Sequence, residues 1–197
     1  MSAISAPFGF RPSFHNSGQV RPKAYTITSA YAANIFEGDP VNLTTNGVIQ
    51  LATSDGTRTG TTDGVSWVGI FAGVEYIDAT GQPKVSKFWP TGTVATGIVA
   101  WVYDDPETLF DVQYTNPSPG TSAQIAVGAG YDWVPTAPGG STSTGLSATQ
   151  LTASVATSGN VQLTRFAGNI SDLITDQFIV ATVRINEHQY KFPTAAI

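Results

Sequence analysis

The chain has 197 residues, no cysteine and a formal net charge of −5. The lack of cysteine excludes disulfides, thiolate metal sites and cysteine nucleophiles, and the acidity argues against a nucleic-acid-binding surface. Asp, Glu, Lys and Arg make up only 12% of the residues, against about 25% in an average soluble domain. We expect a single domain. Because no run approaches about 20 apolar residues, we expect no membrane-spanning helix, and the first fifteen residues lack the features of an export signal.

Residues 1–18 are predicted to form an extended arm. The stretch PFGFRPSF places three phenylalanines among residues 7–14 without a hydrophobic period. Burying each phenylalanine is worth ~1.5–3 kcal/mol, so we expect the arm to dock on another subunit and its deletion (residues 1–14) to leave the fold intact. The alternative, in which the arm folds over its own domain, stays open. The candidate partner-binding residues are Phe8, Phe10, Arg11, Pro12 and Phe14.

Residues 19–197 show short apolar alternations separated by turn residues, which is typical of strands. Ser29 is a candidate cap for one helical turn over residues 30–35, and Asn46-Gly47 predicts a hairpin between two short strands. A polar loop follows at residues 53–64. The run VSWVGIFAGVEYID, residues 65–78, is apolar on both faces, which predicts a central strand covered on both sides, with bulges or a barrel bend at its glycines.

The second half of the chain continues the same pattern. TSAQIAVG, residues 121–128, favours another helical turn, and the Thr/Ser/Gly-rich residues 135–160 are expected to form a loop or ribbon. Further strands are expected within residues 85–89, 98–103, 109–114, 131–134, 161–168 and 178–190. We therefore predict an all-β, single-domain sandwich or distorted β-barrel with an extended N-terminal arm and one or two short helical turns.

Candidate catalytic chemistry is sparse. The chain has two histidines, and no nucleophile elbow, zinc-protease motif or phosphate-binding loop occurs. His188 is interpreted as a structural or interface residue, and a hydrolase is the least favoured function. We expect no enzyme activity and no cofactor.

One acidic cluster allows two interpretations. Asp104, Asp105, Glu107 and Asp111 lie close together in the sequence, and clustered carboxylates suit calcium. However, Asp-Asp-Pro is also turn chemistry, and the strands on both sides need a connection. The turn is favoured and the calcium site is the weaker alternative.

The four tryptophans fall into two groups by their position in the sequence. Trp67 and Trp101 lie within expected strands and are interpreted as core residues. Trp89 and Trp133 border proline-containing turns, which makes them candidates for surface contacts. Through them or through the seven tyrosines, a carbohydrate-binding adhesion module is an alternative function.

Four segments carry a resemblance to a known group of proteins: GFRPSFHNSG, SAYAANIFEGDPVNL, YDDPETLFDVQ and VRINEHQ. Together they resemble tailed-bacteriophage virion proteins that are regarded as head decoration, or cement, proteins. The resemblance covers most of the chain, with little contribution from residues 135–160. It implies a non-enzymatic, β-rich protein that is made in the host cytoplasm, binds the major capsid protein on the outer surface of the capsid, and forms a homotrimer. A tail, neck or baseplate location is the alternative within the virion.

Overall fold

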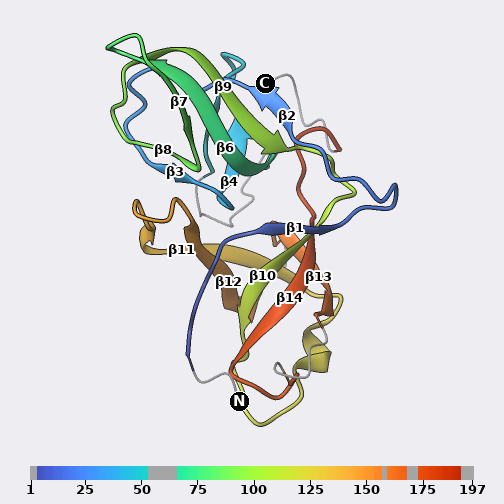
Figure 1. Ribbon diagram of the computed structural model, residues 1–197. Coiled ribbons are helices and arrows are strands. Elements are labelled where there is room, and N and C mark those ends of the chain that lie inside the picture. The colour runs from blue at the N-terminus through green and yellow to red at the C-terminus, as the bar shows by residue number, and fades with distance from the viewer. Residues whose placement is uncertain (1–3, 53–65, 157–158, 168–172, 192–197) are drawn as a thin grey trace.

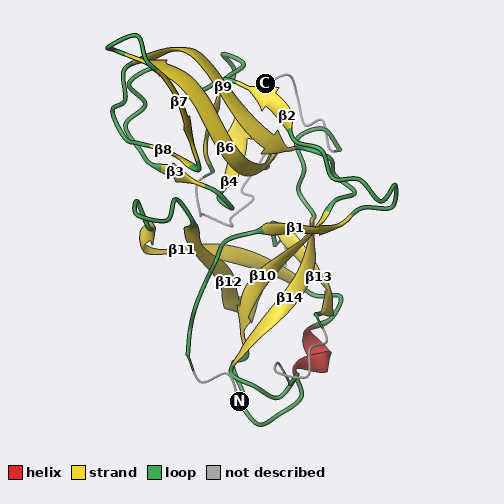
Figure 2. Ribbon diagram, in the orientation of Figure 1, coloured by secondary structure: helices red, strands yellow, loops and turns green. Residues whose placement is uncertain are grey.

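The computed structural model describes residues 4–52, 66–156, 159–167 and 173–191. It consists almost entirely of antiparallel strands arranged as two large sheets, one above the other in Figure 1, with a small third sheet beside the upper one. One 3-10 helix, η1 (Ala123–Ala126), lies at the lower end (Figure 2). The predicted all-β, sandwich-like fold is confirmed. No helix in the described ranges has the length and apolar character needed to cross a membrane.

The lower sheet curls into a half-barrel. Its strand order is β1 (Arg11–Phe14), β10 (Leu109–Thr115), β14 (Phe178–Ile185), β13 (Val161–Phe166), β11 (Gly130–Gly140) and β12 (Ser147–Val155). Alternate residues of the central strands point inward, as period-2 strands require. Their apolar side chains form one core, which includes Phe110, Val112, Ala181 and Val183.

The upper sheet has the order β2 (Lys23–Tyr25), β9 (Ala95–Tyr103), β6 (Gly69–Asp78), β4 (Pro40–Leu43) and β5 (Ile49–Leu51), and β7 (Pro83–Ser86) also pairs with β6. The small sheet joins β3 (Ile35–Phe36) and β8 (Phe88–Trp89). A second core lies within this part of the molecule. The two sheets meet where Trp67, just before β6, and Ile70 of β6 pack into the lower core.

Two strand predictions are confirmed in position, but β6 is not covered on both sides, because Glu75 and Ile77 are exposed on one of its faces. β6 is central, with β9 on one side and β4 and β7 on the other, and a bulge occurs between Phe71 and Gly73. Gly73 adopts a φ of 139° there, which only glycine tolerates without strain. Asn46-Gly47 connects β4 to β5 as a hairpin. The predicted polar loop at residues 53–64 lies outside the described residues.

One of the two predicted helical turns is present and the other is not. Ala123–Ala126 does form a helical turn, and Ser122 caps it. The turn predicted over residues 30–35 is wrong, because Ser29 does not cap a helix. Its hydroxyl instead accepts a hydrogen bond from the Ala95 amide at 3.0 Å, and Ala30 adopts a positive φ of 63°. This segment is therefore tied to β9 as an irregular turn.

Residues 135–160 contribute to a ribbon rather than a loose loop. β11 and β12 form an antiparallel hairpin, and Thr149 and Leu151 of β12 are buried. The Thr/Ser/Gly-rich composition did not indicate the buried positions of this ribbon, because short polar residues can be buried where hydrogen-bond partners are present.

Candidate functional site

The N-terminal segment runs between the two sheets and joins them. The Gly9 amide donates to the Thr149 carbonyl of β12 at 3.2 Å, and the Phe10 amide donates to the Gly38 carbonyl at 2.9 Å. A Cβ atom on Gly9 would lie 2.7 Å from the Ser147 side chain, and Gly9 has a φ of +75°. Only glycine fits this crossing.

Phe10 is a core residue. Its side chain is 1% exposed and packs edge-on against Trp67 at 5.4 Å between ring centroids. Trp67 in turn packs against Trp133. The interpretation of Phe10 as a partner-binding residue is therefore wrong, and the described part of the predicted arm, residues 4–18, is anchored to the fold through this core contact. Deletion of residues 1–14 would remove the Phe10 ring from this core, so we now expect the deletion to destabilise the fold.

The residues before Phe10 close the seam between the two edges of the half-barrel. The Ala6 amide donates to the Gln113 side chain of β10 at 2.8 Å. The same amide group of Gln113 donates to Ser5 at 3.0 Å and to Gln150 of β12 at 2.8 Å. The segment thus satisfies polar groups that the open seam would leave unpaired, and Figure 1 shows it passing alongside β10 and β12.

The other four predicted contact residues lie at or near β1. Phe8 is partly buried, with the Arg11 guanidinium 4.6 Å above its ring centroid. Pro12 is partly buried opposite Phe110, whereas Arg11 is exposed and Phe14 is 47% exposed. β1 is the edge strand of its sheet, and among the described residues no strand pairs with its outer side.

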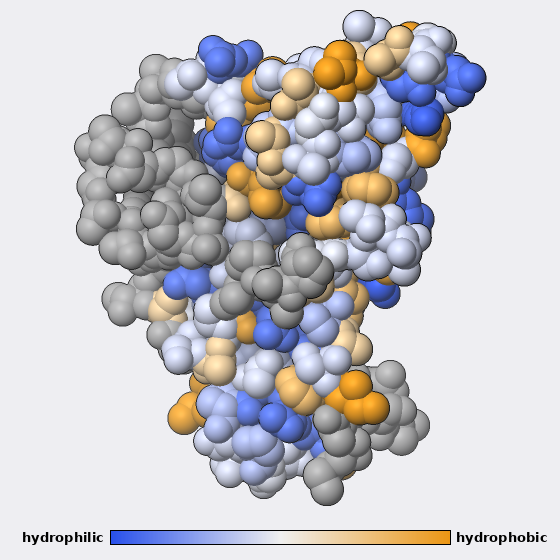
Figure 3. Space-filling view, turned by 90° about the vertical axis from the view of Figure 1, so that its left-hand side faces the viewer, coloured by the Kyte–Doolittle hydropathy of each residue, from blue (hydrophilic) through white to orange (hydrophobic). Residues whose placement is uncertain are grey.

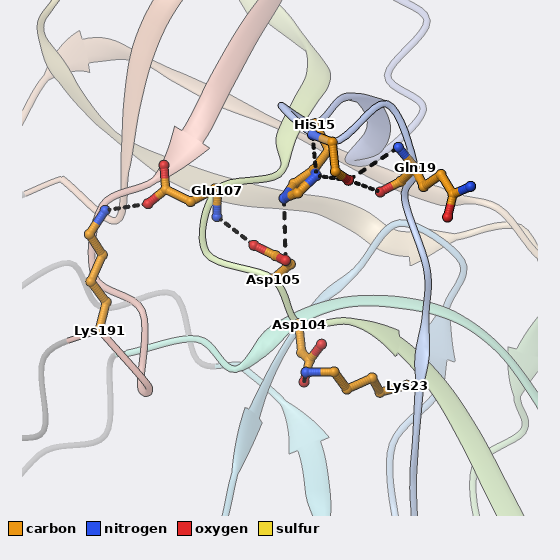
Figure 4. Close-up of polar contacts among 8 residues, drawn as sticks. His15, Gln19, Lys23, Asp104, Asp105, Glu107 and Lys191 are labelled. Atoms are coloured by element: carbon orange, nitrogen blue, oxygen red, sulfur yellow. Dashed lines mark hydrogen bonds and ion pairs between the residues drawn. The ribbon is translucent and has the colours of Figure 1, made fainter.

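A polar cluster lies where β9 turns into β10, beside the loop that follows β1 (Figure 4). The buried Asp104 carboxylate accepts from the Lys23 ammonium at 3.0 Å and from the Tyr25 hydroxyl at 2.7 Å. Burial, with the hydrogen bonds to Tyr190 and Asp104, raises the pKa of Tyr25 above its ordinary value, so this phenol stays a proton donor. A cavity of about 300 Å³ opens beside Asp104.

The remaining acidic residues have separate partners. Asp105 lies 3.3 Å from the His15 imidazole, and Glu107 lies 3.0 Å from the Lys191 ammonium. The Glu107 amide donates to the Asp105 carboxylate at 2.9 Å, which is the hydrogen bond of an Asx turn. Asp111 lies on β10 and accepts from the Thr182 hydroxyl at 2.7 Å.

These contacts agree with the turn rather than the calcium site. The four carboxylates do not converge, and Lys23 already supplies the cation at Asp104. Within the described ranges, no three His, Asp or Glu side chains are grouped so that they could hold a metal ion.

His188 is fully buried beside Trp67. Its Nδ1 accepts from the Tyr190 amide at 3.1 Å, and burial lowers the pKa of its imidazole. A neutral histidine held by backbone contacts in a core fits the structural role that the sequence predicted.

Three of the four tryptophan predictions are wrong. Trp67 is core as expected, but Trp89 and Trp133 are also buried, whereas Trp101 is 36% exposed on β9. The sugar platform proposed at Trp89 and Trp133 is therefore excluded by burial. Proline-containing turns beside a tryptophan did not predict exposure, because the adjoining strands β8 and β11 each have a face turned toward a core.

Apolar exposure is distributed over separate patches, as Figure 3 shows for one side of the molecule.

Comparisons with protein-family models, curated proteins and solved structures return no match.

Proposed function

We propose that the protein is a non-enzymatic virion structural protein that binds the outer surface of a capsid and stabilises the shell by bridging capsomers. Its partners are the major capsid protein and further copies of itself, in a homotrimer. The observation that carries the proposal is the free edge of β1 with the exposed Phe14 beside it.

An edge strand is a surface to which another chain can add a strand. The unpaired backbone groups of β1 would supply hydrogen bonds to a shell subunit, and Phe14 would supply apolar area. Each contact of this size is weak, but several copies acting together on one particle give lasting attachment through avidity. Binding to the assembled shell then stabilises the shell by mass action.

The core position of Phe10 strengthens the role of β1. Because Phe10 is anchored between the sheets, the four residues that follow it are held in a fixed strand. A strand that is already ordered loses less conformational entropy on binding than a free arm does.

The test is co-sedimentation of the purified protein with capsids that lack it. Phe14→Asp should reduce bound protein severalfold, because a carboxylate beside the β1 edge would be desolvated in the contact. Ile125→Asp is the matched control, since Ile125 is also exposed and lies on η1, away from β1. Equal loss in both variants, or full binding by Phe14→Asp, would contradict the assignment of β1.

Cryo-electron microscopy of intact particles separates the shell from the alternative locations. Density for the protein on the icosahedral lattice supports the proposal, and density on the tail axis, neck or baseplate replaces it.

A further inference from the structure

Three arginines share the outer face of the lower sheet. The strand register places Arg11, Asp111, Thr182 and Arg165 in one row across β1, β10, β14 and β13. Arg184 lies on the same face, two residues from Thr182 on β14. All three arginines are exposed. We call Arg11, Arg165 and Arg184 the arginine face.

These arginines have no acidic partner. Among the described residues none of the three forms an ion pair, whereas Lys23, Lys84, Lys87 and Lys191 each pair with a carboxylate. The one acid in the row, Asp111, is hydrogen-bonded to Thr182. In a chain of net charge −5, this sheet face is a local excess of positive charge.

The outer face of the upper sheet has the opposite character. Glu75 of β6 lies between Val99 of β9 and Val85 of β7 in one cross-strand row. Val85 is 85% exposed, and Ile77 and Trp101 are exposed nearby on the same two strands, β6 and β9. Glu75 forms no ion pair within the described ranges. We call Glu75, Ile77, Val85, Val99 and Trp101 the glutamate face.

We propose that the arginine face of one copy binds the glutamate face of the next. The two surfaces are complementary in charge, and the apolar side chains around Glu75 would meet Leu109, which lies partly buried between Phe14 and Arg184 in the cross-strand register. This inference deepens the self-association proposed above and rests on it.

Charge also fixes the kind of contact. Either face packed on itself about a two-fold axis would bring like charges together, which is unfavourable. The contact must therefore be heterologous, and a heterologous contact that closes forms a ring. It uses the outer face of the lower sheet, to which the Arg11 side chain of β1 belongs, and not the hydrogen-bonding edge of β1, so the backbone groups along that edge remain available to the shell. The net negative charge opposes association only over the screening length, about 8 Å at physiological salt.

The experiment measures the assembly state of the full chain by sedimentation velocity over a concentration series. Glu75→Arg should raise the dissociation concentration at least tenfold, because it converts an attractive contact into a repulsive one. Arg165→Glu with Arg184→Glu should have the same effect. Combining all three reversals in one chain restores opposite charges across the contact and should restore assembly.

Arg21→Glu is the matched control, because Arg21 is exposed but lies outside both faces. All four positions are on the surface, and a thermal melt of each variant verifies that the fold is retained. A second variant, Trp101→Ala, tests the apolar part of the contact and should also weaken assembly.

The inference is supported if both single-face reversals weaken assembly, the combined variant recovers it, and Arg21→Glu does not alter it. It is overturned if the reversals leave assembly unchanged or if the combined variant is no better than its parents. A wild-type monomer at high micromolar concentration overturns the self-association as well. Capsid co-sedimentation, measured separately with the same variants, shows whether the protein binds the shell when self-association is lost.

Discussion

Replacing Phe10 by alanine tests whether the N-terminal segment belongs to the core. The ring is 1% exposed and contacts Trp67 edge-on at 5.4 Å. Removing a fully buried phenylalanine costs about 3–5 kcal/mol through lost transfer free energy and the cavity that remains. We therefore expect Phe10→Ala to lower the free energy of unfolding by about 4 kcal/mol.

Urea unfolding followed by tryptophan fluorescence and by far-UV circular dichroism measures this loss. For a urea m-value of roughly 2 kcal/mol/M, the midpoint should fall by roughly 2 M. Fluorescence reports the site directly, because Trp67 and Trp133 belong to the same aromatic group as Phe10. Phe14→Ala is the control and should change the free energy of unfolding by no more than about 0.5 kcal/mol, as surface substitutions usually do.

The opposite result would refute the reasoning. If Phe10→Ala unfolds at the wild-type midpoint but no longer binds capsids, Phe10 contacts a partner and the segment is a free arm after all.

Two further predictions concern the junction between the sheets. Gly9→Ala should destabilise the protein by about 2–3 kcal/mol more than Gly18→Ala does. Both glycines have a φ of +75°, but only a Cβ atom on Gly9 would contact a neighbouring residue. Equal decreases in melting temperature for the two variants would contradict this prediction. Asp39, which accepts hydrogen bonds from the Phe36 amide and from Ser147 and Thr149 of β12, has its pKa raised by burial to about 6 from an ordinary value of 3.8. A carboxyl group whose pKa rises on folding adds stability at low pH, and that stability is lost as the pH rises through about 6. Relative to Asp39→Asn, the wild type should therefore lose roughly 2.4 kcal/mol of unfolding free energy between pH 4 and pH 7, and a difference that does not vary with pH would contradict the raised pKa of Asp39.

Local patterns predicted the elements that depend on local chemistry. The apolar faces of residues 65–78 predicted the central strand β6, and Asn46-Gly47 predicted the hairpin between β4 and β5, since both signals act within a few residues. The segment TSAQIAVG, residues 121–128, predicted the helical turn η1.

The placement of the N-terminal segment could not be predicted in the same way. Phe10 is buried only because Trp67, Trp133 and Gly38 come together around it from distant parts of the chain. Trp89 and Trp101 exchanged their expected roles because the face of a strand that is covered depends on which sheet packs above it. The arginine face arises from register across four strands, and no spacing within one segment indicates it. One signal was available: a glycine between two phenylalanines is an unusual choice for a solvent-exposed arm, and the close contact of Gly9 with Ser147 explains it.

The seam closed by the N-terminal segment also sets an order of folding. Ala6 bonds to Gln113, 107 residues later, and Gly9 bonds to Thr149. During synthesis Ala6 and Gly9 emerge well before Gln113 and Thr149, so this segment stays unpaired until the strands that receive it have been made. Loop closure over such distances is slow, and the waiting phenylalanines are a hazard for aggregation until it occurs. We therefore expect the contacts of Ala6 and Gly9 to be among the last to form.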